Sequence, residues 1–176
     1  MSELTLAQRN HLVASFTNLD LDTDYFIIDT AAGISRNVIH FLLSAQEVIV
    51  VSAPEPTAIV DAYAVIKIIL AEDHNKQIHV LINSVEHAED AHEVFCQINS
   101  VVKRFLNREI DYLGHIERDP HVPQAVRSQM VVTHRFPNAP ASRCFRELAR
   151  RIAQQEGSAA SSDGLVWEKL LNDWVN

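Results

Sequence analysis

Glycine is scarce in this sequence. Its 176 residues include four glycines, and none of them belongs to a G-K-S or G-K-T motif. A loop that cradles nucleotide phosphates needs glycines, so that backbone N–H groups can approach the phosphates, and a lysine that balances their charge. The sequence therefore contains no loop of this kind. No serine lies in a G-x-S-x-G motif either, so a serine hydrolase triad has no support.

Cysteines, basic residues and long apolar runs are also few. The two cysteines, Cys96 and Cys144, have neither metal-binding nor redox spacing, which predicts reduced thiols in a cytosolic protein. No apolar run reaches the ~20 residues of a membrane-spanning helix. The opening residues lack the pattern of a secretory signal. A formal net charge of −8 disfavours attraction to nucleic acid. We expect a cytoplasmic protein without direct nucleic-acid binding.

Nine histidines raise the question of a metal site. Glu89 and His92 form one E-x-x-H motif, a spacing that places both side chains on one helix face. A di-iron site needs a second such pair, and the sequence has none. The surrounding acidic residues are explained more simply as a helix start, where the helix dipole favours them. No metal site is predicted from residue spacing.

The most informative stretch is Y-F-I-I-D-T-A-A-G-I at residues 25–34. Its apolar start has no alternation, which predicts a strand over residues 25–28 covered on both faces. Asp29 would then lie at the carboxyl end of the strand, where open α/β sheets bind ligands, and Gly33 would free the following turn. A carboxylate there can hold Mg²⁺ through water. The alternative is that Asp29 only caps the turn into the next helix.

Hydrophobic periodicity along the chain predicts strands alternating with helices. Continuous β-branched or apolar runs predict further strands at residues 47–52, 78–82 and 110–116, and helices are expected at 34–45, 57–72, 88–107 and 122–129. An opening helix begins near Thr5. Thr57 and Asn138 are expected N-caps, the latter for a last helix with Phe145, Leu148, Ala149 and Ile152 on its buried face. The fold class is therefore α/β, with a right-handed parallel sheet flanked by helices.

The C-terminal part of the sequence changes in composition. Residues 1–156 form the predicted domain, and G-S-A-A-S-S-D-G at 157–164 has the composition of a flexible linker. Residues 165–176 follow as an amphipathic helix whose apolar face carries Trp167, Leu170, Leu171 and Trp174. Tryptophans of this kind favour an interface. A membrane surface, a protein partner and the domain itself all remain possible docking sites for this helix.

Two motifs carry a family resemblance. D-T-A-A-G-I at 29–34, followed by A-P-E-P-T-A-I-V-D-A-Y at 53–63, resembles the MinD/ParA group of deviant P-loop ATPases, and within it the flagellar-number regulators FlhG and FleN. The similarity covers roughly residues 5–152. It implies a partial P-loop NTPase fold of the SIMIBI type in which the P-loop strand is absent.

The resemblance also assigns roles to particular residues. It places Asp29, associated with Mg²⁺, in the family's second switch region together with Thr30 and Gly33. It places Asn83 against the adenine base of ATP. The segment I-E-R-D-P-H-V at 116–122 matches a second base-contacting loop, usually I-P-x-D-x-x-V, through Ile116, Asp119 and Val122. Glu117 stands where the family usually has proline.

A dimer face is implied in the same way. Glu55, Thr57 and Asp61 match the segment that faces the other subunit of a nucleotide-sandwich homodimer. The helix over residues 57–72 is apolar on nearly all sides, which agrees with a covered surface but equally with a buried central helix.

The resemblance implies the C-terminal part of a nucleotide-switched regulator of flagellar number and placement. Its cofactors would be ATP and Mg²⁺, and its partners the flagellar GTPase and a flagellar transcription activator, with possible peripheral attachment to the inner membrane. Without a glycine-rich loop, these 176 residues are expected neither to hydrolyse ATP nor to bind it tightly. The alternative is an interaction module without nucleotide chemistry, which binds a partner through residues 57–72 and the tail. A receiver domain ranks last, because no paired acids precede Asp29.

Overall fold

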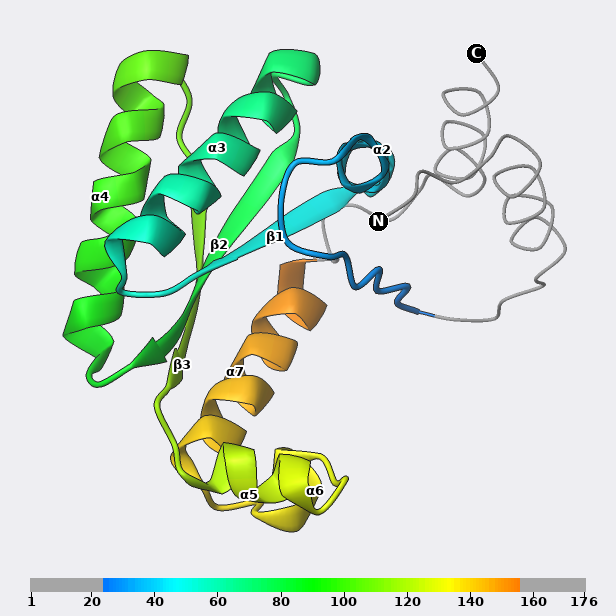
Figure 1. Cartoon of the computed structure of the whole chain (residues 1–176), viewed down its shortest axis with the longest axis vertical. Helices are drawn as coiled ribbons and strands as arrows, with labels where there is room; N and C mark the ends of the chain where they lie inside the picture. Colours follow the sequence, from blue (N-terminus) through cyan, green and yellow to red (C-terminus); the bar gives the residue numbers. More distant parts are fainter. Residues whose placement is uncertain (1–23, 156–176) are drawn as a thin grey trace, which may run out of the picture.

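The computed structural model describes residues 24–155 of the chain (Figure 1). Their centre is a parallel sheet of three strands, β1 (Glu47–Ser52), β2 (Gln77–Val85) and β3 (Asp111–Glu117), in the order β1-β2-β3. The connections run through helices α3 (Pro56–Glu72) and α4 (Ala88–Leu106). The predicted α/β class with a parallel sheet is confirmed.

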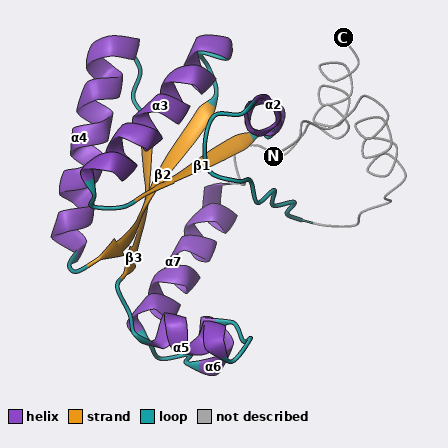
Figure 2. Cartoon of the chain, viewed as in Figure 1, coloured by secondary structure: helices purple, strands orange, loops and turns teal. Residues whose placement is uncertain are grey.

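The remaining helices precede and follow the sheet. Helix α2 (Arg36–Ser44) leads into β1, and α5 (His121–Arg127), α6 (Val132–Arg135) and α7 (Pro140–Gln155) follow β3. In Figure 2, α3 and α4 lie side by side, while α7 runs along the sheet near β3 and joins α5 and α6 at its lower end. The short helix α6 was missing from the sequence prediction.

The hydrophobic core lies mainly between the sheet and the helices α3 and α4. Alternate residues of β2, Ile78, Val80 and Ile82, pack there with Ile66 of α3 and Ile98 of α4, and each of these five is at most 3% exposed. On the opposite face a smaller cluster joins β3 and α7, with Leu81 of β2 packed against it. The central strand is therefore covered on both faces, as expected for a parallel sheet.

Strand β1 is covered on one face among the described residues. Val48 and Val50 are buried against α3, whereas Ile49 and Val51 are 44% and 57% exposed. β1 thus differs from β2 in the covering of its second face, although both strands are continuous apolar runs. Helix α7 covers the second face of the sheet, but it packs against β3, which lies at the opposite edge from β1 (Figure 1).

The strand predicted for residues 25–28 is not formed. The segment lies outside the three-stranded sheet, and Tyr25, Phe26 and Ile27 are 43%, 46% and 87% exposed. An apolar run shows only that a segment suits a strand, whereas a strand also needs a neighbouring strand with which to form a ladder. Asp29 therefore does not lie at the carboxyl end of a strand in this structure.

Two helices begin at prolines rather than at the predicted caps. The N-cap of α3 is Glu55, with Pro56 in the first turn, and α7 begins at Pro140. Thr57 and Asn138 are therefore not the caps that the sequence predicted. Proline suits the first position of a helix because its missing N–H would have no partner there and its φ is already helical.

The buried face of α7 is also shifted from the predicted one. Leu148 is buried and Ile152 packs against the same cluster, as expected, but Phe145 is 41% exposed and Ala149 is exposed. Ala141 and Cys144 take their place in the contact with β3. The apolar spacing of α7 therefore identified only part of the face that packs on the sheet.

Strand β3 contains an irregularity at Gly114. The pairing with β2 shifts between Val80 and Leu81, whose partners are Tyr112 and Gly114, so one residue of β3 is extra. Gly114 has φ +146°, and a Cβ at this position would lie 2.8 Å from Cδ2 of Leu148. A side chain here would meet both backbone strain and α7, so glycine allows the close approach of strand and helix.

No described helix is both long and apolar enough to cross a membrane.

Candidate functional site

The carboxyl ends of the three parallel strands meet at one edge of the sheet. Ser52 at the end of β1 pairs with Ile82 of β2, and Asn83, the next residue of β2, pairs with Ile116 of β3. The loops that leave the strands therefore start side by side. Open α/β sheets bind their ligands at this edge. Two residues that the sequence placed in different base-contacting segments, Asn83 and Ile116, are direct neighbours in the sheet.

The backbone near Asn83 is irregular and exposed. Ser84 has φ +60°, and the pairing with β3 shifts between Asn83 and Val85. The side-chain oxygen of Asn83 accepts a hydrogen bond of 2.9 Å from the N–H of Ser84. Its NH₂ group makes no hydrogen bond to the described residues and is free to donate to a ligand. An asparagine amide can both donate to and accept from a base edge.

The exits of β2 and β3 are joined by backbone and side-chain contacts of Arg118. Its N–H donates to the carbonyl of Val85 over 2.8 Å, and its guanidinium pairs with Glu86 at 3.0 Å. Both charged side chains are largely exposed, so the ion pair itself contributes little to stability. The backbone bond extends the contact between the two strands by one residue and thereby fixes the start of the loop at 117–121.

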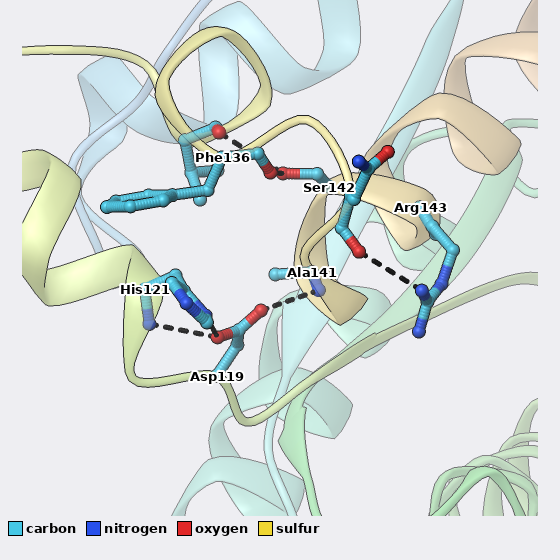
Figure 3. Close-up of polar contacts among 8 residues, drawn as sticks. Asp119, His121, Phe136, Ala141, Ser142 and Arg143 are labelled. Carbon is cyan, nitrogen blue, oxygen red and sulfur yellow. Dashed lines mark hydrogen bonds and ion pairs between the residues drawn. The ribbon is translucent and has the colours of Figure 1, made fainter.

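Asp119 lies inside this loop and is 6% exposed (Figure 3). One carboxylate oxygen accepts from the backbone N–H of His121 at 2.9 Å and lies 2.7 Å from Nδ1 of the same residue. The other accepts from the N–H of Ala141 in the first turn of α7, at 3.0 Å. Asp119 therefore caps α7 from a distant part of the chain and closes a turn at the start of α5.

The pKa of Asp119 is lowered by these contacts. Desolvation by burial raises it, but the backbone N–H groups of His121 and Ala141, with the His121 side chain, outweigh burial and leave the pKa below its ordinary value. Asp119 is accordingly ionised near neutral pH, which strengthens each hydrogen bond that it accepts.

Ile116 and Val122 serve mainly as packing residues. Ile116 is 4% exposed in the cluster between β3 and α7, and Val122 is half-buried against the same cluster. The N–H of Val122 donates to the carbonyl of Asp119. Their side chains are directed into the protein, so a ligand at this loop would meet mainly the backbone. This is compatible with the predicted base contact and does not test it.

The predicted switch residues lie in the loop before α2. Asp29 and Gly33 are exposed, and Gly33 has φ +106°, so the expected need for glycine in this turn is confirmed. Thr30 is half-buried. Asp29 forms no hydrogen bond or ion pair within residues 24–155, and Ser35 rather than Asp29 caps α2, through a contact of 3.5 Å to Val38. Within residues 24–155, no hydrogen bond or ion pair links Asp29, Thr30 or Gly33 to the edge that carries Asn83.

The predicted dimer residues share the exposed start of α3. Glu55, Thr57 and Asp61 are all exposed, and so is the apolar Val60 among them, at 64%. The helix buries Ala62, Ile66, Ile69 and Leu70 in the core. Its nearly all-round apolar character is thus explained in part by burial, while its first two turns offer a free surface.

The E-x-x-H pair has a structural explanation. His87 and Asp90 form a capping box at the start of α4, and the N–H of His87 donates to Asp90 over 3.1 Å. The ring of His92 packs against Phe95 and Tyr112, at centroid distances of 6.3 and 5.9 Å. Neither Glu89 nor His92 belongs to a group of three or more metal-ligating side chains among residues 24–155.

Comparison with known proteins supplies the family. No family model matches the chain. Over 152 residues the chain is 34% identical to the antiactivator FleN of Pseudomonas aeruginosa, which covers 86% of the chain and 54% of FleN. It is 31% identical over 128 residues to the flagellum site-determining protein YlxH of Helicobacter pylori, covering 72% of the chain and 42% of YlxH. The septum site-determining protein MinD of Bacillus subtilis is 28% identical over 134 residues, covering 76% of the chain and 48% of MinD.

The chain is a MinD/ParA-type relative. The resemblance expected from the motifs at 29–34 and 53–63 is confirmed. The chain spans about half the length of the curated relatives it matches: 54% of FleN, 42% of YlxH and 48% of MinD.

Several features of this chain were not predicted from its sequence. The double capping role of Asp119 was missed, although an aspartate often accepts a hydrogen bond from the backbone N–H two residues later, here that of His121, in an Asx turn. The convergence of His115, Glu117 and Cys144 was also missed, since it depends on how α7 packs on β3. Trp167, Leu170, Leu171 and Trp174, with the linker at 157–164 and the opening helix near Thr5, lie outside the described residues.

Proposed function

We propose that this chain is the C-terminal part of a nucleotide-switched, MinD-like regulator of flagellar number and placement. Its similarity to the antiactivator FleN and the flagellum site-determining protein YlxH supports the flagellar role. The observation that carries the nucleotide role is the pairing of Asn83 with Ile116 at the carboxyl edge of the sheet. The pairing puts an exposed amide next to the loop that holds Asp119, as a base-binding pocket would require.

In this proposal, Asn83 donates to and accepts from the adenine base, and the loop formed by Ile116, Asp119 and Val122 closes over it. Asp29 associates with Mg²⁺, while Thr30 and Gly33 change conformation with the terminal phosphate of ATP. The 176 residues contain no glycine-rich loop for the phosphates. We therefore infer that this chain alone neither hydrolyses ATP nor binds it tightly.

The proposal extends to partners and location. Glu55, Thr57 and Asp61, on the exposed start of α3, would face a second subunit in a nucleotide-bound homodimer. The flagellar GTPase and a flagellar transcription activator are the proposed partners. The apolar face of residues 165–176 would bind a membrane surface or a partner, which places the protein in the cytoplasm or at the inner face of the membrane.

Nuclear magnetic resonance on the full chain tests the base contact. Adenosine and ATP are titrated separately to millimolar concentration, and amide shifts are mapped. We expect both ligands to shift residues near Asn83 and 116–122, with similar weak affinity, because the base is recognised and the phosphates are not. Asn83→Ala should abolish these shifts. Asn138→Ala, which removes an exposed amide side chain near α7, is the matched control and should leave them unchanged.

Two results would contradict the base contact. One is a set of shifts that stays in place in Asn83→Ala; the other is no shift at this edge with either ligand. In that case the second candidate gains, an interaction module without nucleotide chemistry. The exposed Val60 on α3, and Ile49 and Val51 on the uncovered face of β1, are the observations that favour it.

The flagellar role is tested in the cell that carries the gene. Deleting the gene should raise the number of flagella per cell, counted by electron microscopy, because the proposed regulator limits that number. Re-expression from a plasmid should restore the original count. An unchanged number and placement of flagella in the deletion strain would contradict this part of the proposal without touching the base contact.

A further inference from the structure

Three side chains with different metal-binding atoms converge between β3 and α7. One ring nitrogen of His115, one carboxylate oxygen of Glu117 and Sγ of Cys144 all lie within 4.8 Å of one another, and each residue is half-buried. We propose that His115, Glu117 and Cys144 form a binding site for a divalent transition metal, with Zn²⁺ as the ion that fits it best. This site is separate from the Mg²⁺ expected near Asp29.

The Gly114 irregularity explains why these side chains meet. In a regular strand, residues three positions apart point to opposite faces. The extra residue at Gly114 instead brings Tyr112 and His115 together, with the tyrosine hydroxyl 3.2 Å from Nδ1 of the histidine. Glu117 follows two residues later, on the same side as His115. Cys144 comes from the second turn of α7, whose start is held by Asp119.

The donor set selects the metal. Thiolate and imidazole suit Zn²⁺, whereas Mg²⁺ and Ca²⁺ prefer oxygen ligands only. Zn²⁺ holds its ligands at about 2.0–2.3 Å in a tetrahedron, which puts the ligand atoms about 3.5 Å apart. Since the three atoms lie within 4.8 Å of one another, each pair must approach by about 1.3 Å at most when the ion binds. Three protein ligands leave the fourth position of the tetrahedron for water.

Tyr112 completes the surroundings of the site. A histidine that binds a metal usually holds a hydrogen bond at its other ring nitrogen, which fixes the tautomer and the ring orientation. The Tyr112 hydroxyl can accept this bond from Nδ1–H and leave Nε2 for the metal.

Binding has a defined proton balance. The Sγ–H bond of Cys144 breaks, its proton goes to solvent and a metal–sulfur bond forms, while His115 binds as neutral imidazole and Glu117 as carboxylate. The two negative ligands then balance the charge of the divalent ion. Binding should consequently release about one proton per ion and weaken at acidic pH.

The test uses the full, reduced chain and its two cysteines. Zn²⁺ is titrated by calorimetry in two buffers of different ionisation enthalpy, and Co²⁺ is titrated by absorption spectroscopy. We expect one ion per chain and a thiolate-to-cobalt charge-transfer band. Cys144→Ser should remove the band and weaken Zn²⁺ binding. Loss of a residue that only hydrogen-bonds to a metal ligand lowers metal affinity about 10- to 100-fold, and loss of the ligand Cys144 should lower it by at least as much. Cys96→Ser, at an exposed position on α4, should leave both unchanged.

Further variants keep the test decisive if Cys144→Ser does not fold. Glu117→Gln and His115→Ala change half-buried residues and should each weaken Zn²⁺ binding, while His134→Ala, at an exposed position on α6, should not. Circular dichroism confirms the fold of each variant. A cobalt band that persists in Cys144→Ser, Zn²⁺ affinity that is unchanged in both other variants, or no binding by the folded wild-type chain would overturn the proposal.

Discussion

At the scale of single residues, Asp119 links stability to the proposed site. Its carboxylate accepts from the N–H groups of His121 and Ala141 while 6% exposed, so it holds the starts of two helices in place. The same residue belongs to the loop that we propose closes over the base. For any substitution at Asp119, an effect on function must therefore be separated from an effect on folding.

Asp119→Ala should destabilise the protein. It leaves the buried N–H of Ala141 without its acceptor, and an unsatisfied buried group of this kind costs about 1–3 kcal/mol. The free energy of unfolding, measured in urea, should fall by that amount. The matched control is Asp61→Ala, at an exposed position on α3, which should change it by less than about 0.5 kcal/mol. Equal losses in both variants would contradict the capping role.

The lowered pKa of Asp119 predicts a pH dependence. A carboxyl whose pKa is lower in the folded than in the unfolded state stabilises the fold fully above its ordinary value of 3.8. That contribution is lost as pH falls through the lower, folded-state pKa. The difference in unfolding free energy between the wild type and Asp119→Asn should be constant near neutrality and shrink below pH 3.8. A difference that grows on acidification would contradict this interpretation.

Gly114→Ala should be more costly than a glycine substitution in an open turn. Both Gly114 and Gly33 have positive φ, so alanine adds strain of roughly 1–3 kcal/mol at either position. Only at Gly114 would the new Cβ also press on buried Leu148, an overpacking that costs typically about 1–3 kcal/mol. Urea unfolding of Gly114→Ala and Gly33→Ala isolates the second effect. Equal destabilisation would show that α7 accommodates the methyl group freely.

At the scale of elements, the arrangement depends on ties between segments far apart in sequence. Lys76, 7% exposed at the start of β2, donates from Nζ to the carbonyls of Leu43 and Ala45 at 2.6 Å each. These carbonyls belong to the end of α2, so the ammonium group satisfies acceptors that the helix leaves open. Through α2, this tie also anchors the loop that contains Asp29 and Gly33.

Lys76→Met should therefore loosen α2. Methionine fills a similar volume but cannot donate, and hydrogen bonds to a charged group contribute about 1.5–3 kcal/mol. Hydrogen exchange should speed up in α2, and the unfolding free energy should fall by a comparable amount. Lys67→Met, at an exposed position on α3, is the control and should have little effect on either measurement. Unchanged exchange in α2 of Lys76→Met would contradict the role of this tie.

The elements also show what the sequence could reveal. The apolar run at 78–82 and the long amphipathic stretch that became α4 predicted their elements, because local pattern and final burial agree there. The β-branched run at 47–52 also predicted its strand, although Ile49 and Val51 are exposed. Residues 25–28 show the limit, since their apolar run could not indicate whether a neighbouring strand would pair with them. Helix starts failed at Thr57 and Asn138 because proline at the first position, and a carboxylate from another loop, replaced local capping.

For the site, motif similarity located residues but not their geometry. The pairing of Asn83 with Ile116 follows from strand register, and the roles of Asp119 follow from the packing of α7, and neither can be read from a single sequence. The cluster of His115, Glu117 and Cys144 has no recognisable spacing, because its third member comes from another element. Residue spacing reports only contacts within one element.

At the scale of the whole molecule, the 176 residues carry the proposed base-contacting edge and a candidate switch carboxylate, but no glycine-rich loop. It spans 54% of FleN and 42% of YlxH. In the proposed function, Asp29 can position Mg²⁺ only where another segment holds the phosphates of ATP. The motif at 29–34 therefore identifies the family more securely than it assigns an activity to these 176 residues.

ATP binding and hydrolysis by the purified 176-residue chain test this account most directly. Calorimetry with Mg²⁺ and ATP, together with a phosphate-release assay, should show no micromolar binding and no turnover, and Asp29→Ala should behave like the wild type in both. Micromolar binding with turnover that Asp29→Ala abolishes would contradict the account, because the chain would then hold the phosphates without a glycine-rich loop.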